Sequence, residues 1–316
     1  MKKFIPALLV SVLSLSAPLA LGAESAAFAP NAVTAQGVEK VTIKHLSGET
    51  EVIKKPKKVV LFDFGVYDSM QKLGLGDNVV ALPTANAPAY VKGSIPASME
   101  NAGGMKQPDL AKIEQLKPDL IVITGRQGKS YEALSKIAPT INLGSDSKHY
   151  IESVKANLAV LGDLYGNQKA VDEQLVQLDK TIADAQKKAA DSKKKVLVLM
   201  HNDGKLIPNN QAVVYDVVKA QRAELQIDEN VDKSKRRVVD TKTIAQANPD
   251  VILIVDRSEA IGAGKLEKTV FEDSNIQETK AYKDGKITYL QSDLWYLSGG
   301  GFVSLTEQVN AVVNAL

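Results

Sequence analysis

The sequence predicts an α/β protein of two small lobes with mainly parallel sheets, divided by a helical span. Three observations support this fold class. Short apolar runs alternate with helical periods along most of the chain, which is typical of parallel strands connected by helices. A purely helical stretch interrupts the alternation near the middle. Residues 113–126 and 244–257 repeat each other at a constant offset, one copy on each side of that stretch.

Residues 1–23 have the layout of a secretory signal peptide. Lys2 and Lys3 precede an apolar run that ends in small residues, and serine and proline interrupt the run, which argues against a membrane span. We expect cleavage after Ala23, with a site near Ala29 as the alternative, and export through the inner membrane to the periplasm. Because the sequence contains no cysteine, we expect neither a lipid anchor nor a disulfide.

The charge of the mature chain is balanced. Removing the signal peptide lowers Lys+Arg from 39 to 37 against 37 Asp+Glu, so the formal net charge is zero. This balance gives no general attraction to nucleic acid, which we therefore do not expect as a partner. The remaining length of roughly 290 residues exceeds what one hydrophobic core usually serves, so two domains are expected.

The first lobe is expected at residues 41–145, after an alanine-rich flexible arm at 24–40. Its expected strands are short β-branched runs, and its expected helices have apolar residues at spacings of three and four. The strands are placed at 59–64, 79–82, 120–124 and 140–143, and the helices at 66–73, 109–116 and 130–137.

A bridging helix is expected at residues 146–166. Its apolar residues fall on one helical face, and Gly166 ends it. A second helical stretch follows at 171–182. The second lobe is assigned to residues 167–316. Its strands are expected at 196–200, 251–256 and 286–290, and its helices at 212–219, at 241–247 and from 305 onwards.

The internal repeat suggests a binding site. In each copy a helix ends before a proline, an apolar strand follows, and an arginine stands eight residues after the proline. Arg126 and Arg257 are therefore expected at the carboxyl ends of strands, where open α/β sheets bind ligands. Their planar, permanently charged guanidinium groups suit anionic oxygens, so an anionic ligand is predicted. The alternative is that each arginine only neutralises Asp256 or a helix end.

A second group of candidate residues follows the strand predicted at 286–290. Trp295 and Tyr296 precede three consecutive glycines, and no lysine follows as in a phosphate-binding P-loop. The phenolate of Tyr296 is a hard oxygen donor that suits ferric iron. The alternative is a tyrosine that packs beside the tryptophan.

The histidines do not form a metal-binding pattern. His45, His149 and His201 are far apart, which argues against a multi-histidine zinc or manganese site. His201 follows a predicted strand, so it is either a residue of the cleft or a structural, hydrogen-bonded histidine. The sequence has no G-x-S-x-G elbow, cysteine nucleophile or H-E-x-x-H helix, so we do not expect an enzyme.

A basic run extends from Lys233 to Arg237 and contains Arg236. Such runs are usually solvated loops. At this place it is alternatively a cationic rim of the cleft that attracts an anionic ligand.

From about Val41 to the C-terminus the chain resembles the periplasmic ferric-siderophore-binding proteins of ABC importers, especially the catecholate and mixed-chelate branch. The resemblance rests on VVLFDFGVYDSMQKLGLGDNVVALP, KPDLIVITGRQ, KIAPTINLG, NPDVILIVDR and WYLSGGG. It implies a class III periplasmic-binding-protein fold, in which a single long rigid helix joins the lobes. It also implies a monomer without an intrinsic cofactor, which carries ferric iron within a siderophore to a permease in the inner membrane.

The resemblance assigns roles to particular residues. Arg126 and Arg257 match arginines that contact the siderophore, and Tyr296 matches a tyrosine that ligates iron left exposed by a tetradentate chelator. Trp295, Gln127 and Arg236 complete the expected ligand contacts.

Two features depart from the family pattern. The segment GKLIPNNQAVVYDV lacks a third arginine, and DKSKRRVVD lacks the family's iron-binding histidine, which leaves His201 as the only substitute. The expected ligand therefore fills all six coordination positions of the iron, or it leaves one open for Tyr296. Haem, a corrinoid or ferric citrate on the same fold is the alternative ligand. An exported enzyme or adhesin is the third hypothesis, for which the sequence offers no motif.

Overall fold

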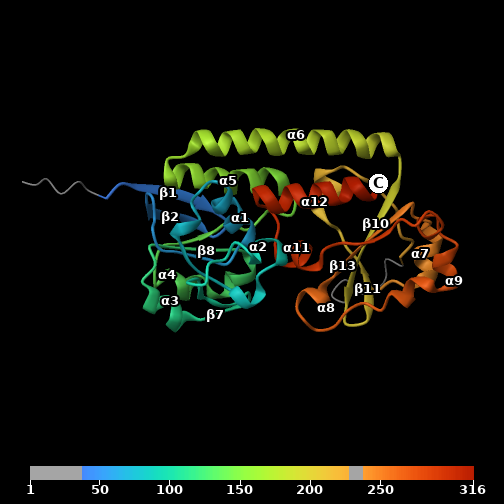
Figure 1. Cartoon of the computed structure of the whole chain (residues 1–316), viewed down its shortest axis with the longest axis horizontal. Coiled ribbons are helices and arrows are strands. Elements are labelled where there is room, and N and C mark those ends of the chain that lie inside the picture. Colours follow the sequence, from blue (N-terminus) through green and yellow to red (C-terminus); the bar gives the residue numbers. More distant parts are fainter. Residues whose placement is uncertain (1–37, 228–237) are drawn as a thin grey trace, which may run out of the picture. The chain divides into compact units, whose positions relative to one another are not determined.

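Two five-stranded sheets organise the part of the chain that the structure describes. The structure is a computed structural model and describes residues 38–227 and 238–316 (Figure 1). The predicted signal peptide, most of the predicted arm and the basic run that contains Arg236 lie outside these residues. Residues 38–316 form one compact unit.

The first sheet has the strand order β5-β4-β3-β8-β9, and all its neighbouring strands are parallel. Its strands are β3 Val59–Leu61, β4 Val79–Leu82, β5 Glu100–Asn101, β8 Leu120–Ile123 and β9 Thr140–Asn142. Every residue of β3, β8 and β9 is buried, as expected where both faces of a parallel sheet are covered. The four strands predicted for this lobe are confirmed, although three of them end earlier than predicted.

The second sheet is mixed and is built around β10. This strand pairs in parallel with β12 and β13 and antiparallel with β11, while β14 pairs in parallel with β13. The strands are β10 Lys195–Asn202, β11 Lys205–Pro208, β12 Gln221–Arg222, β13 Val251–Asp256 and β14 Ile287–Tyr289. The predicted fold class, two α/β units with mainly parallel sheets, is confirmed.

Three hairpins were not predicted from the sequence. One is formed by β10 and β11, and another by β1 Lys40–His45 and β2 Gly48–Ile53. A third, minimal hairpin joins β6 Gly103–Gly104 to β7 Gln107–Pro108. Antiparallel pairs need only a short turn, so they leave no helical period between the strands that would mark them.

Most helices connect or cover the strands. In the first lobe they are α1 Phe64–Lys72, α2 Ala89–Lys92, α3 Leu110–Leu116 and α4 Tyr131–Ser135. In the second they are α7 Thr241–Ala247, α8 Arg257–Ala260, α9 Ser274–Gln277, α10 Lys280–Lys283, α11 Ser292–Leu297 and α12 Phe302–Ala315. The helix predicted at 212–219 is a single π-helical turn, η4 Val213–Val217.

Two helices occupy the span between the sheets. α5 Tyr150–Tyr165 ends at Gly166, whose positive φ of 67° lets the chain reverse, and α6 Gln168–Ser192 then runs for 25 residues to β10 (Figure 1). The long helix of the predicted fold is therefore α6. The sequence pattern places its residues in the second lobe, because the helical stretch predicted as the bridge ends at Gly166. The lobe boundaries themselves remain a prediction.

The internal repeat is a structural repeat. Asp109 and Asp240 each accept a backbone N–H at the start of α3 and α7, and both helices end in a left-handed residue before the proline. Asp119 then accepts backbone N–H groups just before β3, and Asp250 accepts one at the start of β10. The same residue types thus fix the same helix–strand unit in each lobe, and each unit ends at an arginine.

The largest hydrophobic core continues from one sheet to the other. Alternate residues of a strand face opposite sides, so Leu120 and Val122 of β8 belong to this core while Ile121 and Ile123 belong to a separate cluster. The same core contains residues of α5, α6, α12 and β13. Within residues 38–227 and 238–316, no helix is both long and apolar enough to cross a membrane.

Candidate functional site

The two repeat arginines stand at the carboxyl ends of strands in different sheets. Arg126 lies in the 3₁₀ turn η3, Gly125–Ser130, directly after β8, and Arg257 is the first residue of α8, directly after β13. Arg126 is exposed and Arg257 is half-buried. Both side chains are therefore available at the edge where the sequence predicted a ligand.

Gln127 holds the turn that carries Arg126. Its Oε1 accepts hydrogen bonds from the backbone N–H and hydroxyl of Thr124, at 2.9 and 3.1 Å, and its Nε2 donates to the carbonyl of Met105. The side chain is 1% exposed. Gln127, which the sequence suggested as a ligand contact, thus has its amide engaged by the protein at both ends.

Asp256 is engaged by groups other than Arg257. Its carboxylate contacts Nδ1 of His201 at 2.7 Å and accepts the N–H groups of Glu259 and Leu266 at 3.0 and 2.6 Å. Burial would raise the pKa of Asp256, but these hydrogen bonds hold it below its ordinary value. His201 and Asp256 are both buried, so His201 is placed as a structural partner of Asp256.

Both arginines converge on Tyr296. Nε of Arg257 donates to the Tyr296 hydroxyl at 2.7 Å, and Nη2 of Arg126 donates to the Tyr296 backbone carbonyl. The guanidinium carbons lie 5.0 Å (Arg126) and 5.4 Å (Arg257) from the centre of the tyrosine ring, within cation–π range. The structure therefore gathers three predicted site residues into one cluster, which we call the arginine–tyrosine cluster.

The cluster favours the phenolate form of Tyr296. Partial burial raises the pKa of the phenol, but the hydrogen bond from Arg257 and the charges of Arg257, Arg126 and Lys106 outweigh it, so the pKa lies below its ordinary value. A phenolate is the form that binds a hard cation such as ferric iron.

Lys106 is a cation that the sequence did not reveal. It is exposed in the turn between β6 and β7, next to Met105, whose carbonyl is bound by Gln127. Gln127 thereby ties this turn to the turn of Arg126. An isolated lysine outside a repeat or motif gives no signal in the sequence, so only the fold places it near Tyr296.

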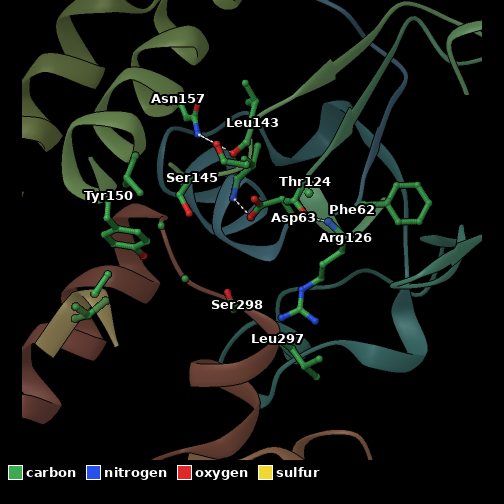
Figure 2. Close-up of a pocket in the computed structure, with 18 of the residues that line it drawn as sticks. Phe62, Asp63, Thr124, Arg126, Leu143, Ser145, Tyr150, Asn157, Leu297 and Ser298 are labelled. Carbon is green, nitrogen blue, oxygen red and sulfur yellow. Dashed lines mark hydrogen bonds between the residues drawn. The ribbon is translucent and has the colours of Figure 1, made fainter. Parts of the chain in front are cut away.

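A cavity of about 410 Å³ adjoins the cluster. Arg126, Trp295 and Tyr296 line it together with Tyr150 of α5. Figure 2 shows the Arg126 side chain extending toward the segment of Leu297 and Ser298. Trp295 is 5% exposed, so its indole forms part of the wall and is a local reporter for the cavity.

The glycines after Tyr296 allow close packing of two helix starts. A Cβ at Gly65 or at Gly301 would lie within 3.0 Å of backbone atoms of the other segment. Asp68 of α1 accepts the first N–H groups of α12, from Val303 and Ser304, at 3.0 Å each. The glycine segment that follows α11, the helix of Tyr296, is thus fixed against the first lobe.

Of the two remaining candidates, the structure describes only His201, which is not in the cluster. Arg236 lies outside the described residues, and His201 is turned toward Asp256. In the described part of the chain, no group of three or more His, Cys, Asp or Glu side chains forms a possible metal site. Tyr296 is the remaining candidate for direct contact with iron carried by a ligand.

The lowered pKa of Tyr296 predicts a separate ionisation step. In an ultraviolet titration of the ligand-free protein, we expect one tyrosine to ionise below its ordinary range, and this step to be missing in Tyr296→Phe. Burial raises the pKa of five other tyrosines, which keeps their steps apart: Tyr90, Tyr150, Tyr165, Tyr215 and Tyr289. An unchanged titration in Tyr296→Phe would contradict the electrostatic description of the cluster.

Comparison with known proteins gives matches along most of the chain. A family model described as periplasmic binding protein matches residues 59–294. The petrobactin-binding protein YclQ of Bacillus subtilis is 38% identical over 281 residues, which cover 88% of this chain and 89% of that protein. The ferric-anguibactin-binding protein FatB of Vibrio anguillarum is 27% identical, with 86% of each chain covered.

Solved structures agree with these matches. The crystal structure of YclQ from Bacillus subtilis has a TM-score of 0.82, with 88% of this chain and 98% of that chain covered at 38% identity. The periplasmic catecholate-siderophore binding protein VctP from Vibrio cholerae has a TM-score of 0.77 at 30% identity, with 88% of this chain and 100% of that chain covered.

Proposed function

Because the chain belongs to the periplasmic binding protein family, we propose that it is the substrate-binding component of an iron–siderophore ABC importer. The ligand is an anionic ferric siderophore of the catecholate or mixed-chelate class, which the protein delivers to a membrane permease. The protein acts by binding and release, without catalysis and without a cofactor of its own, and iron enters only as part of the ligand.

One observation carries the choice of ligand: two guanidinium groups from different sheets converge on one tyrosine. Catecholate oxygens of a ferric chelate are negatively charged, and hydrogen bonds from arginine to such oxygens are among the stronger ones in proteins. Arg126 is exposed and makes one hydrogen bond to Tyr296, so other N–H groups of its fork remain to meet the ligand.

Tyr296 supplies a possible iron contact. A chelate that leaves one coordination position open would accept its phenolate oxygen, and the neighbouring cations lower the cost of forming that phenolate. A chelate that fills all six positions would instead be held by the arginines alone. The same cluster therefore serves both kinds of ligand.

Fluorescence of the single tryptophan tests this function. Trp295 lines the cavity, so ferric bis-catecholate and tris-catecholate chelates are expected to quench it saturably at micromolar concentrations. Haem is titrated in parallel and followed by its Soret band. Absence of quenching with every ferric catecholate would contradict the proposal, and a shifted, sharpened Soret band on mixing haem with the protein would favour the haem alternative.

The state of the exported protein is a separate prediction. We propose that the signal peptide is removed and that the mature protein is a free, extracytoplasmic monomer without a lipid, since the sequence has no cysteine thiol for a diacylglyceryl group. Native mass spectrometry of the mature protein is expected to show one chain at the mass of its amino acids. An added lipid mass or a dimer would overturn that part of the proposal.

A further inference from the structure

The ends of β10 and β13 place two pairs of residues side by side. The strands are parallel neighbours, and His201 is directly opposite Asp256. Asn202 follows His201 in β10, and Arg257 follows Asp256 of β13. The inner pair, His201 and Asp256, is buried and in contact at 2.7 Å. In the outer pair, Oδ1 of Asn202 accepts a hydrogen bond from Nη1 of Arg257.

A tight turn fixes Asn202. Asp203 and Gly204 have φ angles of 53° and 71°, the left-handed pair that a two-residue hairpin turn needs, and Asn202 pairs with Lys205 across it. Asp203 N–H donates to the hydroxyl of Ser258 at 2.9 Å, so the turn is also tied to α8.

His201 contributes to the same fixation. The N–H of Gly204 donates to Nε2 of His201 at 3.1 Å, which leaves Nδ1 to donate to Asp256. Its two ring nitrogens thus connect the hairpin turn to the end of β13. Asn202 therefore sits on a rigid support beside the start of α8, where its amide is held in place before any ligand arrives.

We propose that Asn202 is the positioning residue that holds the Arg257 guanidinium against the Tyr296 hydroxyl. This inference deepens the proposed function and rests on it for its biological meaning. Neither the internal repeat nor the family pattern pointed to Asn202, because an asparagine at a hairpin corner is explained by the turn alone.

The geometry gives Asn202 a specific task. Arginine has a long side chain with substantial rotamer freedom, and one hydrogen bond through Nε leaves the planar group free to swing. The second bond, from Nη1 to Asn202, fixes the plane so that Nε continues to face Tyr296. An asparagine oxygen does this without a negative charge, so the charge of Arg257 remains available to the phenolate and to an anionic ligand.

The ionisation of Tyr296 depends on the charged groups around its hydroxyl. Arg257, Arg126 and Lys106 act on its pKa, and Asp256 is directed toward His201 and backbone N–H groups. An uncharged substitution at Asn202 should therefore reach Tyr296 only through Arg257. This dependence separates a positioning role from a general effect on the hairpin.

The experiment measures Tyr296 ionisation in the ligand-free protein by ultraviolet titration. Asn202→Ala is expected to raise the pKa of Tyr296, because Arg257 is no longer held against it. In an Arg257→Ala background the same substitution is expected to cause no further shift. Lys205→Ala, across the same turn, is the control and is expected to leave the titration unchanged.

A second variant, Asn202→Asp, keeps the test valid if Asn202→Ala does not fold. Asn202→Asp keeps the size and the acceptor oxygen, but its carboxylate would neutralise Arg257, so it is also expected to raise the pKa of Tyr296. Affinity for a ferric bis-catecholate should fall about 10-fold in Asn202→Ala, the size of one charge-assisted hydrogen bond.

The outcomes separate the inference from the proposed function. Unchanged Tyr296 ionisation in both Asn202 variants, or an equal shift in the Arg257→Ala background, would overturn the positioning role. If the shifts occur as expected but the wild-type protein binds no ferric chelate, the positioning role stands and the proposed function fails.

Discussion

Replacement of both Arg126 and Arg257 by alanine is expected to weaken the binding of an anionic ferric catecholate by about a thousand-fold. Each guanidinium supplies charge-assisted hydrogen bonds, and one such bond typically contributes about 1.5–3 kcal/mol of free energy. The loss should be at least additive, because Arg257 also holds the Tyr296 hydroxyl at 2.7 Å. The Tyr296 ring would in addition lose both cations that lie over it.

Affinities from tryptophan quenching at two salt concentrations measure this effect. The matched control is Arg222→Ala, which removes an arginine that stacks on Tyr215, bonds to Asn210 and does not line the cavity. Wild-type affinity should fall as salt rises, and the double variant should depend on salt less steeply. A double variant that binds within about threefold of the control would show that the arginines do not recognise the ligand.

Gly301→Ala is expected to lower the stability of the fold strongly. A Cβ at this position would lie within 3.0 Å of the Gly65 carbonyl and of the Asp68 carboxylate. Backbone atoms cannot move aside cheaply, so the start of α12 must shift and Asp68 must lose its N–H partners. Overpacking together with a poorly satisfied buried carboxylate should lower the free energy of unfolding by about 3 kcal/mol or more.

Chemical denaturation of Gly301→Ala and of Gly93→Ala measures the difference. Gly93 has an ordinary helical φ of −71° and open space around its Cβ, so alanine there should change stability little. Because α11, which carries Tyr296, connects to α12 through the segment that ends at Gly301, Gly301→Ala should also weaken chelate binding. Equal stability of the two variants would mean that the contact between α1 and α12 is not as tight as described.

The repeat explains why much of the site was predictable. Its two copies contain the same helix, proline and apolar strand, so the positions of Arg126 and Arg257 at strand ends followed from local rules. The burial of β8 and β13 also followed from their continuous apolar sequences. The helix predicted at 241–247 is α7, with the same first and last residues.

Other features depend on contacts between distant segments. The hydrogen bond from Gln127 to Met105 ties the turn of Lys106 to the turn of Arg126, and Lys106 acts on the pKa of Tyr296. Asn202 meets Arg257 only because β10 and β13 are neighbours. The ligand contact of Gln127 stays a prediction, and its side-chain amide contacts Thr124 and Met105 in the structure. A motif marks a position, and the tertiary structure decides which way its side chain points.

The helical span shows a second limit. The apolar period of residues 151–164 was visible, but its end at Gly166 was read as the end of the bridge. The exposed face of α6 is rich in Lys, Asp and Gln. This helix is long because it packs on α5 and α12, and these tertiary contacts are not visible in the sequence. Propensity and period cannot indicate which of two consecutive helices crosses between sheets.

The central claim, recognition of an anionic ferric siderophore by the arginine–tyrosine cluster, is tested most directly by charge discrimination. Affinities of the wild-type protein are measured for a ferric tris-catecholate, which is anionic, and for an uncharged ferric trihydroxamate of similar size. We predict that the catecholate binds about 100-fold more tightly or better, since two charge-assisted contacts are lost with the neutral chelate. Equal affinity for the two chelates, or binding of the hydroxamate alone, would contradict the account.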